Sequence, residues 1–499
     1  MPDSFTLQTE LRPVLPVIRG CKDYTQQQRL LQRVNRILRA SGLEDLFVEL
    51  HRQDFIQHSD QRTRAVGPKE HQRQAQESIQ ALRCTVLKNF LHCGYRELSQ
   101  RLAECALYRW FCALREFPEV QVPGKSRLHD YAHWLSAAQM ELVLSSLTKA
   151  MVNEERALEI GLENELDTAG VFVDSTCLKA NMHFPVDWVL LRDGVRTLVK
   201  SIVAIRRHGL RERISEPEVF IARINALTMR MSQAGRNRQT CKKARKQVLR
   251  EMKRLCVVVE KHALRYRDTL QAHWQETDLS RAQTEVILVR MNNVLKQLPQ
   301  ARRQAHERII AERAVPSAQK ILSLYENDVH VIVRGKAGAD VEFGNSLFVA
   351  ETREGFILDH ELLKDQSAGD AKWLRGRLGV LRKLSGGRLE EVTADRGFES
   401  AGLKRELLDA GLKCHVCPKS PAELESRLEE ESFRSNLKRR AQTEGRIAIL
   451  KNVFLGGTPK AKGYDRRRVT VSWAVLAHNL WWVARVKWKE SESVLSRAA

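Results

Sequence analysis

The sequence predicts an α/β protein in which a mixed sheet flanked by helices follows an all-helical N-terminal region. Apolar residues recur at three- and four-residue spacing over residues 24–165, which indicates amphipathic helices. A short apolar strand at residues 170–176 precedes a long helical tract over residues 188–325 that few prolines or glycines interrupt. From about residue 328 the period changes to two, and strands then alternate with helices. A helical insertion is therefore expected after the first strand of the core.

The N-terminal helices carry a pattern found in DNA-binding domains. The segment "YRELSQRLA" is of the kind that opens a helix-turn-helix. Farther on, Pro123 and Gly124 predict a turn, Ser126 a helix N-cap, and Arg127 lies in the first turn of a short basic helix. Such a helix fits the major groove of DNA. An ordinary helical bundle with a basic polar face explains the same pattern.

The charge balance favours a polyanionic partner. Lys and Arg number 83 against 61 Asp and Glu, which gives a formal net charge of +22. Within residues 221–260 there are eleven Lys and Arg against two acids, a basic helical face suited to phosphate contacts. Nucleic acid is the commonest partner of such a chain. A solvated basic surface, with a solvated helical hairpin at residues 221–260, is the alternative.

Several features indicate a cytoplasmic protein. The N-terminus shows no basic segment followed by an apolar run, so no signal peptide is expected. The ten cysteines are scattered irregularly, as suits a reducing compartment. The apolar segment "VTVSWAVLAHNLWWVARV" near the C-terminus has His478 and Asn479 at its centre, which favours a core helix over a membrane span.

Two predicted strands, far apart in sequence, reach a carboxylate. The apolar run beginning at Gly170 stops at Asp174, and "EEVTADRGF" runs apolar to Asp395 and breaks at Gly397. If these strands are parallel neighbours, the two carboxylates lie side by side. A hard divalent cation such as Mg²⁺ or Mn²⁺ relieves their repulsion. Two ions about 4 Å apart would activate a nucleophile and stabilise a leaving oxygen.

A third carboxylate usually completes such a site, and the predicted helix "RRAQTEGRIAILK" offers Glu444. Arg440 and Lys451 share its helical face, so the same face can hold both a metal and a phosphate. A surface glutamate that forms helix salt bridges is the alternative reading. The acidic run at residues 429–431 offers competing third ligands, and the pattern alone does not choose between them.

Taken together, these segments resemble the DDE-type transposases of bacterial insertion sequences, which have an RNase H-like catalytic core. The resemblance is carried by "VFVDST" with "FPVDWVLL", "VRGKAGADVEFGNSLFVAET", "VTADRGFES" and "EGRIAILKNVFLGG". The segment "YRELSQRLAECALYRWFCAL" is similar to the N-terminal domain that recognises element ends. "WAVLAHNLWW" is similar to the closing helix of such cores. The likeness spans roughly residues 75–485.

The resemblance implies a triad of Asp174, Asp395 and Glu444 that holds two Mg²⁺ (or Mn²⁺) ions and performs phosphoryl transfer without a covalent protein–DNA intermediate. Arg446 and Lys451 match the basic residues that contact DNA near the glutamate. Lys336 is a further candidate for a phosphate contact, with a solvated turn lysine as the alternative.

The implied partners are the terminal inverted repeats of the element and the target DNA. A homodimer is expected in the synaptic complex, no membrane is expected, and the location would be the cytoplasm near the nucleoid. A catalytically inactive DNA-binding relic and a structure-selective nuclease remain alternatives. The expected domains are a DNA-end-binding helical domain at 1–165, a first core strand at 166–187, a basic helical insertion at 188–325, the remaining core at 326–487 and a tail at 488–499.

Overall fold

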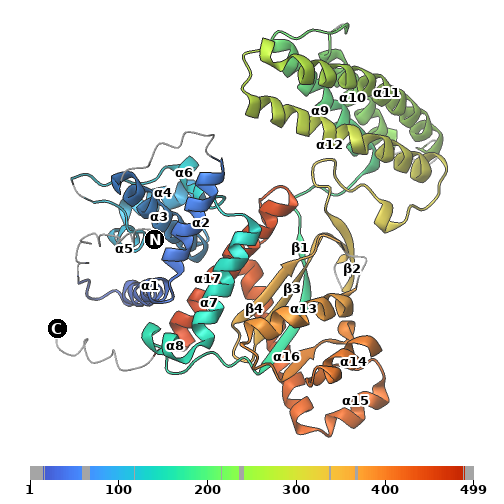
Figure 1. Ribbon diagram of the computed structural model, residues 1–499. Coiled ribbons are helices and arrows are strands. Elements are labelled where there is room, and N and C mark those ends of the chain that lie inside the picture. The colour runs from blue at the N-terminus through green and yellow to red at the C-terminus, as the bar shows by residue number, and fades with distance from the viewer. Residues whose placement is uncertain are drawn as a thin grey trace. The chain divides into compact units, whose positions relative to one another are not determined.

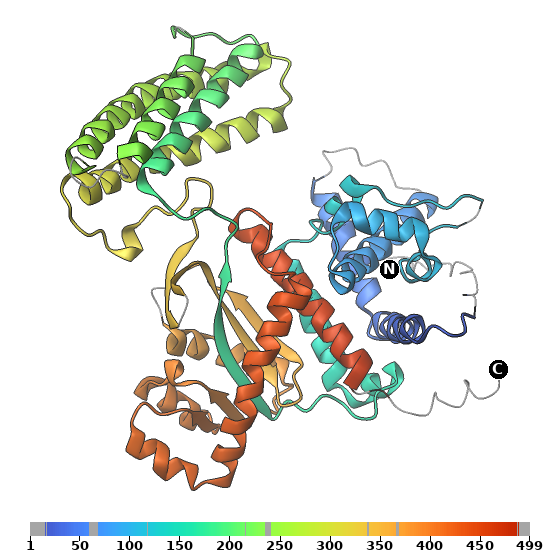
Figure 2. The ribbon, with the colours of Figure 1, turned by 180° about the vertical axis from the view of Figure 1, so that it is seen from behind.

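The chain divides into two compact units. Unit 1 comprises Met1–Leu178 and Ser346–Ala499, and unit 2 comprises Lys179–Asn345 (Figures 1 and 2). Unit 2 is thus an insertion between two parts of unit 1. The computed structural model describes residues 15, 17–58, 68–116, 118–214, 216–234, 241–336, 339–365, 369–486 and 488.

Helices form the described N-terminal part of unit 1. They are α1 (Lys22–Ala40), α2 (Leu43–His58), α3 (Pro68–Leu91), α4 (Tyr95–Glu104), α5 (Ala106–Phe111), α6 (Lys125–Tyr131), α7 (Ala137–Val152) and α8 (Glu154–Ile160). The buried Arg83 of α3 joins several of them, because it pairs with Glu44 and donates to Phe111 O at 2.7 Å. The N-cap of α6 is Gly124, so the prediction of Ser126 at that position was wrong by two residues.

Unit 2 is built around four long helices that share one apolar core. The helices are α9 (Asp187–Arg207), α10 (Glu218–Ala234), α11 (Cys241–His273) and α12 (Arg281–Ala305). Short turns follow at Trp274–Glu276, His306–Ile310 and Ser317–Gln319. Gly194 of α9 lets Leu298 of α12 approach closely, since a Cβ there would lie 2.7 Å from Leu298 Cδ1. The predicted helical tract at 188–325 is therefore a packed helical unit.

In the described part of the chain, six strands form a mixed sheet, which confirms the coarse fold prediction. They are β1 (Gly170–Lys179), β2 (His330–Lys336), β3 (Ala339–Thr352), β4 (Ile357–Leu362), β5 (Glu391–Ala394) and β6 (Lys413–Val416). The order is β2-β3-β1-β5-β6, and β4 pairs with β3. The β1–β5 and β5–β6 pairs are parallel, while the β2–β3 and β3–β4 pairs are antiparallel.

Helices cover the part of the sheet that belongs to unit 1. They are α13 (Asp370–Leu384), α14 (Ala401–Asp409), α15 (Pro421–Leu428), α16 (Glu431–Ile449) and α17 (Tyr464–Val486), and a π-turn at Leu450–Phe454 follows α16. Val171 and Val173 of β1 pack in one apolar cluster with Leu374 of α13 and Leu407 of α14. The opposite side of β1 faces α16, where the Arg439 guanidinium lies 4.5 Å from the centre of the Phe172 ring.

The C-terminal helix α17 is a core helix, as its central polar residues predicted. Asn479 is buried, accepts a hydrogen bond from Ile357 N at 3.0 Å and donates to Ile357 O at 2.8 Å. The side-chain amide of Asn479 therefore satisfies both backbone polar groups of Ile357, the first residue of β4. Among the described residues, none of the helices has both the length and the apolar character needed to cross a bilayer.

Candidate active site

The parallel pairing of β1 with β5 brings two predicted acids together. The register pairs Val171 with Val392 and Val173 with Ala394. The next residues along the two strands are Asp174 and Asp395, so they stand at matching positions at the end of the ladder. Matching residues of neighbouring strands point to the same face of a sheet. The predicted adjacency of the two carboxylates on parallel neighbouring strands is thus reproduced at the level of register.

One detail of the strand prediction was wrong. β1 does not end at Asp174, since it continues to Lys179. What ends beside Asp174 is the partner strand β5, whose last residue is Ala394. Asp395 then caps a short turn, and its Oδ1 accepts a hydrogen bond from Gly397 N at 2.8 Å. The carboxylates meet where β5 leaves the sheet, so Asp174 has space beside it that a central strand residue normally lacks.

Helix α16 lies across the face of β1 that presents Asp174. Phe172 contacts Arg439 of this helix, and Thr176 accepts a hydrogen bond from Lys451 Nζ at 3.2 Å. Side chains alternate along a strand, so Phe172, Asp174 and Thr176 share one face. Glu444 lies on α16 between the two contacts, in the part of the helix that passes Asp174.

A buried ion pair between α16 and β3 fixes the position of α16 on the sheet. Arg439 pairs with Glu351 of β3 at 2.9 Å, and Thr443 Oγ1 donates to the same Glu351 oxygen at 2.8 Å. Glu351 is 1% exposed, so its charge depends on these partners and on Arg446, whose Nε lies 3.9 Å from its other oxygen. Glu444 follows Thr443 directly and is exposed. The helix is therefore anchored by residues adjacent to the third predicted acid.

The three predicted acids interact electrostatically. Burial, together with the negative charges of Asp395 and Glu444, raises the pKa of Asp174 from 3.8 to about 6. The hydrogen bond from Ser175 N to Asp174 Oδ1, at 2.7 Å, and the nearby Arg440 cation act in the opposite direction. Burial and neighbouring negative charge therefore outweigh the hydrogen bond and the cation at this carboxylate.

This arrangement suits a hard divalent cation held by few protein ligands. Among the described residues, no group of three or more His, Cys, Asp and Glu is arranged to hold one metal ion. Mg²⁺ is usually held by one or two carboxylates, with waters and substrate phosphate oxygens completing its shell. Asp174 and Asp395 provide such a pair, and a cation between them would offset the repulsion of their charges, which contributes to the raised pKa of Asp174. The residues therefore fit Mg²⁺ or Mn²⁺.

Sequence reasoning missed a fourth acid at this site. Asp370 begins α13, and its Oδ2 accepts a hydrogen bond from Ser175 Oγ at 3.0 Å. A Cβ on Gly397 would lie 3.0 Å from Asp395 Oδ1 and 3.4 Å from Asp370 Oδ2, so both acids flank that glycine. Burial and the Asp395 charge raise the pKa of Asp370. The only sequence signal was an acid in the first turn of a helix, which commonly serves the helix dipole alone.

The competing acids at residues 429–431 lie at the other end of α16. Glu430 is its N-cap, and Glu431 forms an exposed ion pair with Arg434 one turn along. Glu444 is 13 residues farther along the helix, which corresponds to about 20 Å. Among the acids proposed from sequence as the third ligand, Glu444 acts on Asp174, and no such interaction is found for the acidic run.

Two of the predicted DNA-contacting cations lie beside the acids. Arg440 lowers the pKa of Asp174, which places its charge within electrostatic reach of that carboxylate. Lys451 Nζ donates to Thr176 Oγ1 and, at 2.7 Å, to Cys177 O. These bonds hold Lys451 on β1 two and three residues beyond Asp174.

The other predicted cations lie elsewhere. Arg446 donates to Glu354 O and fills the space above Gly355, so it supports the β3–β4 turn, and burial lowers its pKa. Arg127 pairs with Glu77 of α3, and its guanidinium lies 5.9 Å from the centre of the Trp134 ring. Lys336 is the last residue of β2, and its side chain lies outside the described residues.

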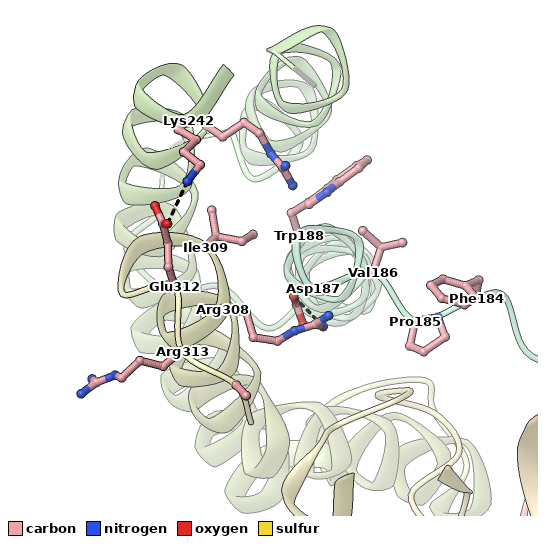
Figure 3. A pocket seen from close by; sticks show the side chains of 12 residues that line it. Phe184, Pro185, Val186, Asp187, Trp188, Lys242, Arg308, Ile309, Glu312 and Arg313 are labelled. Carbon is pink, nitrogen blue, oxygen red and sulfur yellow. Dashed lines mark hydrogen bonds and ion pairs between the residues drawn. The ribbon is translucent and has the colours of Figure 1, made fainter. Parts of the chain in front are cut away.

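A separate pocket of about 560 Å³ lies within unit 2 (Figure 3). Asp187 at its floor is buried and accepts two hydrogen bonds from Arg308 Nη1, at 2.9 and 3.0 Å. Glu312 at its rim pairs with Lys242 at 3.0 Å and with Lys246 at 2.8 Å. Both acids are thus paired with cations of the same unit, and Asp187 has a structural role.

Comparisons of the chain with protein-family models, with curated proteins and with solved structures gave no match. The assignment of function therefore depends on the residues of this chain and their geometry.

Proposed function

We propose that the protein is a DDE-type transposase with an RNase H-like core, which cleaves DNA at the ends of an insertion sequence and joins those ends to target DNA. The matching positions of Asp174 and Asp395 on parallel neighbouring strands, with Glu444 in electrostatic contact, support it most directly. The mixed sheet, with helices on the faces of its unit 1 part, is consistent with such a core.

Asp174 and Asp395 are the residues that would hold Mg²⁺ or Mn²⁺, with Glu444 closing the shell when DNA is bound. Two bound ions would lower the pKa of the attacking water and neutralise charge on the phosphorus and the leaving oxygen. The protein's own contribution is to fix two carboxylates on a rigid sheet, so that little reorganisation is needed at the moment of reaction.

The reaction divides into two displacements at phosphorus. In the first, a water oxygen bonds to phosphorus as the bond to the 3′ oxygen breaks, and that oxygen leaves as a hydroxyl. In the second, this 3′ hydroxyl attacks a phosphodiester of target DNA, so one phosphodiester bond forms and one breaks. Glu444 would orient each nucleophile and accept its proton, while Lys451 and Arg440 would hold the flanking phosphates.

The charge of the chain supports DNA as the substrate. A net charge of +22 attracts a polyanion at long range, and binding that depends on phosphate contacts weakens steeply as salt rises. Joining requires two element ends to be held together, so we propose a homodimer that synapses the terminal inverted repeats and then engages target DNA.

The proposal is tested by incubating the protein and Mg²⁺ with a labelled duplex that carries the ends of the encoding element, together with a supercoiled target plasmid. The transposase predicts 3′ cleavage at the element boundary and covalent joining of label to plasmid. Cleavage of branched DNA without any joining would instead identify a structure-selective nuclease. Salt-sensitive binding with neither product would identify an inactive DNA-binding protein.

A further inference from the structure

Unit 1 contains a second basic feature that the catalytic site does not use. A cleft of about 630 Å³ lies between the C-terminal end of α3, the first residues of α4, helix α6 and the segment that joins the π-turn to α17. Its walls therefore combine the N-terminal helices with the chain that directly follows the catalytic helix α16. We refer to it as the α3–α17 cleft.

The lining of the α3–α17 cleft is basic. Among the described residues that line it, none is an aspartate or a glutamate. The lining includes four lysines and arginines and three histidines, namely Lys88, Lys460, Lys462, Arg466, His92, His129 and His133. Asp130, an acid close to the lining, contacts His129 at 3.4 Å and is itself more than half exposed. A cleft of this composition attracts an anion.

The cations of the cleft act on one another. Burial lowers the pKa of Lys88, and the charge of Lys460 lowers it further. Burial likewise lowers the pKa of His133; the charges of His129 and Arg466 also lower it, while a hydrogen bond from its ring to His129 O and the charge of Asp130 raise it. An anion bound in the cleft would offset the part of these shifts that comes from neighbouring cations.

The cleft is a preformed part of the fold. Trp473 of α17 donates to Ala132 O at 3.1 Å, which fastens one wall to the other. His92 has a positive φ of 51°, a conformation that a residue other than glycine adopts only where its surroundings hold it. Its ring lies 6.3 Å from that of Phe454, the last residue of the π-turn. Little ordering would be needed when a ligand enters.

The position of the cleft points to DNA as the source of the anion. Phe454 lines the cleft and lies three residues beyond Lys451, which is bonded to β1 next to Asp174. Three residues of helix span about 4.5 Å. The lining of the cleft thus begins within one helical turn of Lys451 along the chain, so both lie on one continuous segment after α16.

We propose that the α3–α17 cleft binds backbone phosphates of the DNA strand adjacent to the cleavage point, and so connects the N-terminal helices to the catalytic helix through the DNA. The inference rests on the proposed function for the identity of the DNA, but its test does not require catalysis. Lys460 and Lys462 provide the exposed charges at the mouth, and Lys88 lies deeper, with its Nζ 5.1 Å from the centre of the Tyr95 ring.

The test measures the salt dependence of binding in the Glu444→Ala background without Mg²⁺, by fluorescence anisotropy of a labelled duplex. The Lys460→Ala/Lys462→Ala double variant is compared with Lys372→Ala/Lys413→Ala, which removes two exposed lysines elsewhere in unit 1. We expect the slope of log K against log[NaCl] to fall by about 2 in the cleft variant and by less than about 0.5 in the control. Restoring charge with Lys460→Arg/Lys462→Arg should recover the slope.

The loss should be equal for element ends and unrelated duplexes, because phosphate contacts carry no sequence information. A slope change no larger than that of the control would overturn the proposal. The proposal would also be overturned if inorganic phosphate protected the wild type against unfolding, this protection required the two lysines, and the DNA slope stayed unchanged. The cleft would then serve a small phosphate ligand. If the wild type with Mg²⁺ cleaves no element ends while the slope change is observed, the proposed function fails and the phosphate site stands.

Discussion

Replacing Asp174 with asparagine should stabilise the protein at neutral pH while abolishing its activity. The folded chain raises the pKa of Asp174 from 3.8 to about 6, mainly because the carboxylate is buried and lies near Asp395. At pH 7 the ionised group therefore costs about 3 kcal/mol relative to the unfolded chain. Asparagine has nearly the same shape and no charge, so this cost should disappear.

The sign of the pH dependence follows from the raised pKa. The stabilising contribution of the protonated form is fully present below pH 3.8 and is lost as pH rises through about 6. The advantage of Asp174→Asn should therefore be about 3 kcal/mol at pH 7 and below about 1 kcal/mol at pH 4. For a unit of this size, the larger figure corresponds to a rise of roughly 3 to 6 °C in Tm.

Thermal and urea unfolding of both proteins at pH 7 and pH 4 provides the assay. Asp409→Asn, which removes an exposed charge at the end of α14, is the control and should change stability by less than about 0.5 kcal/mol. Mg²⁺ should raise the Tm of the wild type and leave Asp174→Asn unchanged. An Asp174→Asn protein that is less stable than wild type at pH 7, or equally stabilised at both pH values, would refute this reasoning.

The remaining predictions concern the groups around the acids. Arg439→Met should lower unfolding stability by about 3 kcal/mol, because it removes the nearer of the two cations that pair with the buried Glu351 carboxylate and leaves only Arg446 at 3.9 Å, and a Glu351→Gln change in the same chain should recover part of the loss in urea titrations. Lys451→Met should slow cleavage at least tenfold with little change in Tm. Single-turnover rates equal to those of the wild type would show that Lys451 takes no part in the reaction. Asp370→Asn should raise the Mg²⁺ concentration needed for half-maximal cleavage about tenfold, because Asp370 accepts a hydrogen bond from Ser175 and its charge acts on Asp395; an unchanged Mg²⁺ titration would show that its role is purely structural.

Much of the fold could be predicted because its signals are local. The change of hydrophobic period near residue 328 identified β2, β3 and β4, and turn residues separated β5 from α14. The extent of β1 could not be read in the same way. Beyond Asp174 the strand carries polar residues, and it stays extended because it remains paired in the sheet, which is a tertiary interaction.

The residues of the candidate site likewise divide into those that local sequence patterns predicted and those that depend on tertiary contacts. Asp174 and Asp395 stand at the ends of apolar runs, so their pairing followed from one assumption about strand order. Glu444 needed the resemblance, since periodicity alone did not separate it from the acidic run upstream. Asp370 comes from a helix that the sheet order brings close, which no spacing in the sequence indicates. The inward direction of Arg446 likewise depends on Gly355, a partner 91 residues away.

The most direct test of the account compares Mg²⁺-dependent cleavage of a duplex bearing the element ends by wild type, Glu444→Ala and Glu429→Ala. Both variants remove one exposed glutamate: Glu429 lies between α15 and α16, and Glu444 lies in the C-terminal part of α16. We predict that cleavage by Glu444→Ala falls at least a hundredfold while Glu429→Ala cleaves like wild type. Full activity in Glu444→Ala, or loss of activity in Glu429→Ala alone, would contradict the assignment of Asp174, Asp395 and Glu444 to one active site.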